Sequence, residues 1–152
     1  MAKDIPLNEI ILRKYEKPYH SDKRELVKKI CLSLGLLQPG DSRDIIIDIL
    51  GVLIDSQKSK EVLSSDEIRE RVKKRREDSG LEMKGVAESN IRRQLKRLAD
   101  MMLIDKIENH YRLSEFETLE EIFINKFEKF IIPQTIERVK EYLREVNNDS
   151  TS

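Results

Sequence analysis

The segment from Ser42 to Leu53 constrains the fold more than any other part of the chain. Its apolar residues cover much of the circumference of a helix, so the helix that it predicts must be surrounded by other elements. These apolar positions are Ile45, Ile46, Ile49, Leu50, Val52 and Leu53. Ser42 is the expected N-cap, and the polar residues from Ser56 to Lys60 end or fray the helix. We therefore expect a central core helix with neighbours on several sides.

Capping signals predict further helices before and after this segment. Ser21 is the expected N-cap of an earlier helix, which Gly35 ends, because glycine readily adopts the left-handed conformation that follows many helices. Ser64 and Glu67 have the spacing of a capping box, in which each side chain satisfies a free amide at the helix start. A third helix therefore begins at Ser64 or the residue after it and stops at Ser79-Gly80.

The next stretch predicts a fourth helix followed by a β-hairpin. The helix runs from about Ala87 to Met101 or Met102. Two short strands are expected to follow at Leu103–Ile107 and Tyr111–Leu113, with Glu108-Asn109-His110 as the turn between them. The sequence thus predicts a mainly α-helical fold with one small β-hairpin.

The two faces of the fourth helix differ in chemistry. At about 100° per residue, Ile91, Leu95 and Leu98 fall on one side and must face the core. The opposite side and its flanks carry Ser89, Asn90, Arg92, Arg93, Lys96 and Arg97. Cations neutralise phosphates and release counterions, and arginine or asparagine can contact a base edge with two hydrogen bonds. We expect these six residues to contact DNA, with His110 and Arg112 near the hairpin reaching the flanking backbone or minor groove.

Part of this stretch resembles winged-helix transcriptional regulators. The resemblance rests on the run from Ser89 to Leu98, on Met102-Leu103-Ile104-Asp105-Lys106, and on Tyr111-Arg112-Leu113. It implies that residues 41–114 form a winged helix-turn-helix whose fourth helix enters the major groove of double-stranded DNA. The chain departs from the pattern in two places: Met102 stands where glycine is common, and the Leu81–Val86 loop is longer than the tight turn of the compact motif.

The regions on either side of residues 41–114 are expected to be helical attachments. Residues 1–40 form an N-terminal extension, an arm followed by one helix. Residues 115–146 form C-terminal helices with a break near Pro133, and residues 147–152 form a disordered tail. An apolar stripe at Leu119, Ile122, Phe123, Phe127 and Phe130 predicts a dimer interface or, alternatively, packing on the domain's own core. A homodimer fits the paired half-sites that the resemblance implies.

Charge is segregated along a chain whose formal net charge is zero. Residues 65–97 contain 11 Lys and Arg against 7 Asp and Glu, whereas residues 114–152 contain 5 against 9. The overall balance therefore does not exclude a nucleic-acid partner for the middle of the chain. The acidic C-terminal part suits a surface that faces away from DNA.

No motif points to catalysis, to a metal or to a cofactor. His20 and His110 lie far apart, and Cys31 lies on an apolar helix stripe, so the three lack metal-ligand spacing. Without a long apolar run or a signal-peptide pattern, and with one cysteine, we expect a cytoplasmic protein with no membrane span. The predicted function is sequence-specific binding of double-stranded DNA by a homodimeric, non-enzymatic transcription regulator. The alternative is a winged-helix protein–protein adaptor in a replication, segregation or transcription complex, with a merely solvated cationic face.

Overall fold

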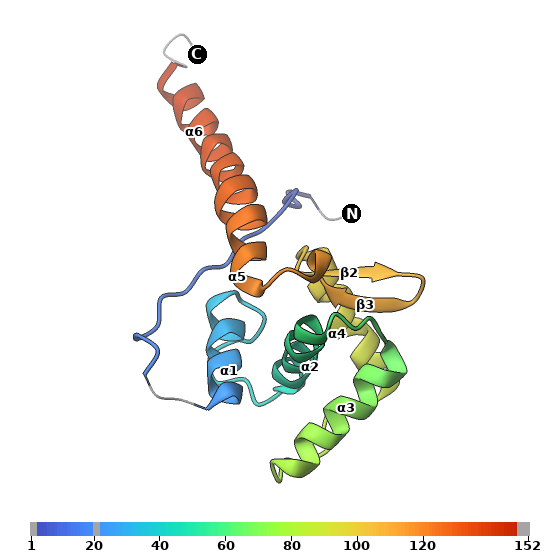
Figure 1. Ribbon diagram of the computed structural model, residues 1–152. Helices are drawn as coiled ribbons and strands as arrows, with labels where there is room; N and C mark the ends of the chain where they lie inside the picture. The colour runs from blue at the N-terminus through green and yellow to red at the C-terminus, as the bar shows by residue number, and fades with distance from the viewer. Residues whose placement is uncertain (1–2, 20–21, 149–152) are drawn as a thin grey trace.

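The computed structural model describes residues 3–19 and 22–148 and shows a mainly helical chain with a small antiparallel sheet (Figure 1). The first elements are α1 (Lys23–Ser33), α2 (Ile45–Ser59), β1 (Leu63–Ser64), α3 (Ser65–Asp78) and α4 (Glu88–Asp100). They are followed by β2 (Ile104–Ile107), β3 (His110–Leu113) and a 3-10 turn (Ser114–Phe116). The chain ends in α5 (Leu119–Ile122), a π-helical segment (Phe123–Ile131) and α6 (Ile132–Asn148). The predicted fold class, mainly α with a small hairpin, is confirmed.

The sheet has three strands in the order β1-β3-β2, all antiparallel. The predicted hairpin is present, with Ile107 paired to His110 across a two-residue turn. Both turn residues, Glu108 (φ 49°) and Asn109 (φ 64°), are left-handed, which is the geometry that matches the twist of two-residue hairpins. His110 therefore belongs to β3 and not to the turn. The strand β1 was not predicted, because two residues are too few to show an alternating pattern.

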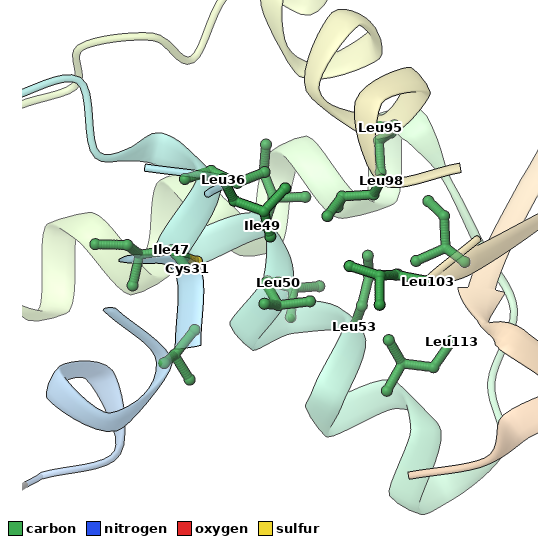
Figure 2. Close-up of a cluster of buried hydrophobic side chains, with 14 of the residues drawn as sticks. Cys31, Leu36, Ile47, Ile49, Leu50, Leu53, Leu95, Leu98, Leu103 and Leu113 are labelled. Atoms are coloured by element: carbon green, nitrogen blue, oxygen red, sulfur yellow. The ribbon is translucent and has the colours of Figure 1, made fainter. Parts of the chain in front are cut away.

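The centre of the fold is α2, as its apolar circumference predicts. All six of its predicted core positions are buried, and α2 contacts α1, α3, α4 and β3. Figure 2 shows Ile49, Leu50 and Leu53 in one cluster with Leu95 and Leu98 of α4. Each fully buried leucine or isoleucine stabilises the fold by about 1.5–3 kcal/mol relative to an exposed one. The position of α4 is thus fixed by its apolar face against α2.

Two predicted helix starts are wrong and one is confirmed. The N-cap of α1 is Asp22, whose carboxylate accepts from the Glu25 amide at 2.8 Å, while Ser21 lies outside the described residues. Ser42 does not cap α2, which begins three residues later. The chain turns at residues 41–43, where Asp41 binds both the amide and the guanidinium of Arg43. By contrast, α3 begins with the predicted capping box of Ser64 and Glu67.

The N-terminal extension is fastened to the end of α1. The Arg13 guanidinium donates to the carbonyl of Leu32 in the last turn of α1 (2.8 Å) and to the carbonyl of Leu37 in the turn that follows (3.2 Å), so it supplies a partner for one carbonyl at the helix end. Gly35 follows α1 with a left-handed φ of 75°, and a Cβ there would lie 2.7 Å from the Cβ of Ile11. Glycine is therefore needed at this position for its backbone and for the close approach of the arm.

A buried ion-pair network joins α1, α2 and α3. Asp48 in the apolar run of α2 is 1% exposed and accepts from Arg76 of α3 at 2.7 Å and from Arg24 of α1 at 3.2 Å. The same two arginines also bind Asp44. Burial alone would raise the pKa of Asp44, but the two arginines outweigh it and hold that pKa below the ordinary value. The Arg76 Nε donates to the Glu82 carbonyl at 2.6 Å, so the network also holds the long loop before α4.

The end of α4 explains the departure at Met102. Met102 has a left-handed φ of 65°, its amide donates to Ala99, and the Leu103 amide donates to Leu98. These are bonds of a helix ending that prefers glycine at the left-handed position. Met102 therefore adopts the left-handed backbone conformation that glycine usually provides at this position, at the cost of local strain.

The C-terminal arm continues through Pro133, so the predicted break there is wrong (Figure 1). Ile132 at the junction has helical φ and ψ of −62° and −51°. A proline near the start of an α-helical segment removes no needed hydrogen bond, and the π-helical turns before it change the bonding pattern at the junction. Asn147 and Asn148 also belong to α6 and not to a disordered tail, and the remainder of that predicted tail lies outside the described residues.

The apolar stripe at the start of this arm is divided between the core and the surface. Ile122 and Phe127 are 1% and 5% exposed and pack within the chain's own core, with Leu119 and Phe123 partly buried against it. Phe130 is 52% exposed. The first turns of the arm are therefore anchored to the body, and the unpartnered apolar surface begins beyond them. No helix in the described part of the chain is long and apolar enough to cross a membrane.

Candidate nucleic-acid interface

The exposed face of α4 carries the residues that the sequence singled out. Ile91, Leu95 and Leu98 are each fully buried against the core. The side chains that consequently point to solvent are those of Ser89, Arg92, Arg93, Lys96 and Arg97, with Asn90 half-buried at the edge. The predicted division of the helix into an apolar and a cationic face is therefore present in the structure.

On one side of α4 lies a hollow between this helix, the start of α3 and the β2–β3 hairpin. We call it the hairpin-side hollow, and its polar lining includes Ser64, Ser65, Asp66, Arg92, Lys96, Asp100 and Lys106. Lys106 comes from β2, and its ammonium lies 6.0 Å from the centre of the Tyr111 ring. The hollow therefore gathers three cations from two elements, against the two carboxylates of Asp66 and Asp100.

On the other side of α4 lies a second hollow, bounded by the turn before α2 and by the loop before α4. We call it the loop-side hollow, and its charged lining consists of Asp41, Arg43, Asp44, Lys84, Arg93 and Arg97. Asp41 is paired with Arg43, and Asp44 belongs to the buried network. The helix α4 thus forms a ridge with an excess of cations on both of its sides.

The two cations facing the hairpin-side hollow are paired along the helix surface. Arg92 binds Glu88 at 2.6 Å, and Lys96 binds Asp100 at 2.9 Å, both one turn apart. These side chains are between 51% and 75% exposed. Exposed pairs of this kind contribute about 0.3–0.5 kcal/mol, so either cation can exchange its carboxylate for another anion at little cost.

The loop-side cations have partners of a different kind. Arg97 donates to the Leu36 carbonyl at 3.0 Å and to Gln94 at 2.8 Å, which ties it to the N-terminal extension. Arg93 donates to the Asn90 side-chain oxygen at 3.2 Å. Of the two, Arg93 is therefore the more available for an external partner.

Asn90 holds the loop before α4 in place. Its amide donates to the Gly85 carbonyl at 2.9 Å, and its side-chain oxygen also accepts from Gln94. Gly85 has a left-handed φ of 78°, and a Cβ there would come within 3.1 Å of the Asn90 amide nitrogen. Reading a base with Asn90 would require these bonds to break, so its observed role is to position the helix start.

The two hairpin residues predicted to reach DNA are placed differently. Arg112 is 24% exposed, donates to Asp105 on the opposite strand at 3.0 Å and lies 4.9 Å from the Phe116 ring centre. It is occupied within the chain, and we do not include it in the proposed interface. His110 is exposed beside the start of α3, where it pairs with Ser64 in the sheet.

Sequence reasoning missed Arg43, Lys84 and Lys106 as members of this surface. Arg43 lies before α2, far from α4 in sequence, and Lys84 lies in the irregular loop just before α4, so the approach of both side chains to this helix depends on the fold. The position of Lys106 could have been inferred from the predicted strand. Alternate residues of a strand point to opposite faces, so Lys106 lies on the face opposite to that of its neighbours Asp105 and Ile107. The cationic surface is thus wider than the helix alone.

A reactive thiol and a metal centre have little support among the described residues. Cys31 is fully buried, and burial raises the pKa of its thiol to about 12, which makes it a poor nucleophile or metal ligand. No cluster of three or more His, Cys, Asp or Glu side chains with metal-site geometry occurs within residues 3–19 and 22–148. His20 falls outside these ranges.

Comparison with known proteins provides no relative from which a function could be inferred. No family model matches the chain, and no curated protein and no solved structure is significantly similar to it. What the chain does must therefore be inferred from the geometry of its own surface.

Proposed function

We propose that residues 41–114 form a winged helix-turn-helix that binds double-stranded DNA, with α4 in the major groove and the β2–β3 hairpin as the wing. The order α2, β1, α3, α4, β2, β3 supports this proposal, because three helices followed by a hairpin is the arrangement of such domains. The pairing of β1 with β3 anchors the hairpin beside α3 and α4. Binding at specific sequences would suit a transcription regulator.

The observation that carries the proposal is the position of α4 as a ridge between two cation-rich hollows. B-DNA has a major groove about 12 Å wide that admits one α-helix, with a phosphate backbone on either side of it. A helix in the groove therefore needs cations on both flanks. Arg92, Lys96 and Lys106 supply one flank, and Arg43 and Lys84 are placed to supply the other.

Residues at the middle of the exposed face are the candidates for contact with bases. Ser89 and Arg93 lie there by helical geometry, opposite the buried Ile91 and Leu98. Arginine and lysine can donate to the two acceptors of guanine, and serine adapts to several bases. We assign Arg93 the leading role in base contact, because its side chain is exposed and its hydrogen bond to the Asn90 side-chain oxygen lies at the surface.

Fluorescence-anisotropy titration of mixed-sequence duplex DNA tests the proposal. Wild type should bind at low salt and weaken steeply as salt rises, because phosphate binding releases counterions. The Arg92→Glu/Arg93→Glu variant should lose most of this binding. The matched control is Lys14→Glu/Lys58→Glu, which changes the net charge equally at exposed positions that line neither hollow.

Two results would contradict the proposal. One is the absence of binding by wild type at low salt, and the other is equal binding by the α4 variant and the control. Either would favour the alternative function, a protein–protein adaptor whose docking, being largely apolar, changes little with salt.

A further inference from the structure

The helix α6 presents an unpartnered apolar stripe along its whole length. Ile136, Val139, Leu143 and Val146 follow one another at spacings of three, four and three residues, and we call these four residues the α6 stripe. They are 51%, 54%, 65% and 79% exposed, in that order. This is the spacing of the a and d positions of a coiled coil, which brings all four to one seam.

The surroundings of α6 leave this seam uncovered. Figure 1 shows α6 extending away from the body of the protein, and none of its residues is buried. It has 17 residues, which corresponds to about 25 Å of helix. Most helical stability in proteins comes from packing of an apolar face. A free α6 would therefore lack the packing that usually stabilises such a helix.

The charges of α6 favour a copy of the same chain as the covering partner. Arg138 pairs with Glu141 and Arg144 with Glu137, all on the side of the helix away from the stripe. The positions that flank the seam are Thr135, Lys140, Tyr142 and Asn147, of which one is charged. Identical chains bring like charges together at a shared axis, so a seam with nearly neutral flanks suits self-association.

We propose that two copies of this chain associate through their α6 stripes as a short parallel coiled coil. In parallel register each stripe residue meets its own counterpart, Thr135 of one copy flanks Lys140 of the other, and Tyr142 flanks Asn147. No like charges then face each other across the seam.

This interface differs from the one that the sequence predicted. Ile122 and Phe127 are used by the core, so the α6 stripe, not the phenylalanine-rich segment, carries the contact. A parallel pair leaves both bodies at the same end of the coil. The interface does not depend on DNA binding, since none of its residues lines either hollow beside α4.

Sedimentation of the full chain over a wide range of concentrations tests the association. Wild type should approach twice the chain mass of 17.9 kDa as concentration rises. Val139→Glu/Leu143→Glu should remain at the single-chain mass, whereas Glu137→Gln/Glu141→Gln on the opposite side of α6 should behave as wild type. Circular dichroism and thermal unfolding of the body check that the variants fold, which we expect because α6 contributes no buried residue.

Disulfide formation tests the orientation. A Val146→Cys variant should cross-link under mild oxidation, because a parallel pair places the two copies of this residue opposite each other within disulfide reach. A Glu141→Cys variant on the opposite side of α6 should not. Buried Cys31 is unreactive and can stay in place in both.

The proposal is overturned if wild type stays at the single-chain mass at all concentrations or forms a trimer or larger assembly. It is equally overturned if the Val139→Glu/Leu143→Glu variant still pairs. A dimer in which Val146→Cys fails to cross-link would contradict the parallel arrangement. None of these results bears on whether α4 binds DNA, which the anisotropy titration decides separately.

Discussion

Two sets of ion pairs in this protein share their chemistry and differ in their surroundings. Asp48 and Arg76, in the network that joins α1, α2 and α3, are almost fully buried. Arg92–Glu88 and Lys96–Asp100 on α4 are more than half exposed at every side chain. A buried charge that loses its partner cannot turn to water, whereas an exposed one can. The first set therefore fixes the architecture, and the second leaves its cations free to change partners.

The largest effect is expected from breaking the buried set. Arg76→Ala leaves Asp48 without its closest partner and should lower the free energy of unfolding by about 3–5 kcal/mol. Urea denaturation followed by circular dichroism measures this. The Asp48→Leu/Arg76→Met variant removes both charges and should recover much of the loss. A loss below about 1 kcal/mol in Arg76→Ala would mean that the network does not hold α2 and α3 together.

An intermediate effect is expected at the hairpin, where the Asp105–Arg112 pair is about one quarter exposed. Arg112→Ala should lower the free energy of unfolding by about 1–2 kcal/mol, between the values for the buried and exposed sets. Urea denaturation again provides the value. A loss as large as that of Arg76→Ala would contradict the proposal that the free-energy cost of breaking an ion pair rises with the burial of the pair.

The same pair should show a pH dependence of defined sign. Burial would raise the pKa of Asp105, but the Glu115 amide and the Arg112 guanidinium, both donating to Asp105 Oδ2, hold that pKa below its ordinary value. A carboxyl with a lowered folded-state pKa stabilises the fold above its unfolded pKa of about 3.9, and the stabilisation is lost as pH falls through the folded value. The stability difference between wild type and Arg112→Ala should therefore shrink below about pH 4. Urea denaturation at a series of pH values tests this, and a difference that grows on acidification would contradict it.

The smallest effect on stability is expected on α4. Lys96→Ala should change the free energy of unfolding by no more than about 0.5 kcal/mol, because the exposed Asp100 is simply hydrated when its partner is removed. Asp100→Ala is the matched control, and it should be equally mild. If either variant cost more than about 1.5 kcal/mol, the α4 pairs would be structural and less available to a ligand.

The two sets also differ in how far they can be predicted, because contacts within one helix can be predicted from the sequence and contacts between distant helices cannot. The capping box at Ser64 and the apolar face at Ile91, Leu95 and Leu98 depend on neighbours within one helix, and both were predicted. The partners of Arg76 lie about 30 residues away, so its burial follows from the packing of α2 on α3. One signal was present: Asp48 is a lone carboxylate within an apolar run, and such a residue needs a buried partner.

The same reasoning applies to the candidate site. The cations on α4 were read from helical periodicity, but the hollows that flank it depend on how the turn before α2 and the hairpin come beside it. The sequence alone predicts Arg112 as a DNA contact, because its cross-strand register with Asp105 is not visible before the strands are paired. The continuous helix through Pro133 follows from a π-helical segment for which the sequence offers no pattern.

The central claim is that the cations of α4 bind phosphates, and the slope of log K for duplex DNA against log salt tests it most directly. Each phosphate contact contributes about 0.9 to the magnitude of this slope. The Arg92→Gln/Lys96→Gln variant should therefore have a slope smaller by about 2 than wild type, with unchanged folding stability, while Lys14→Gln/Lys58→Gln keeps the wild-type slope. Equal slopes for wild type and the α4 variant would contradict the account.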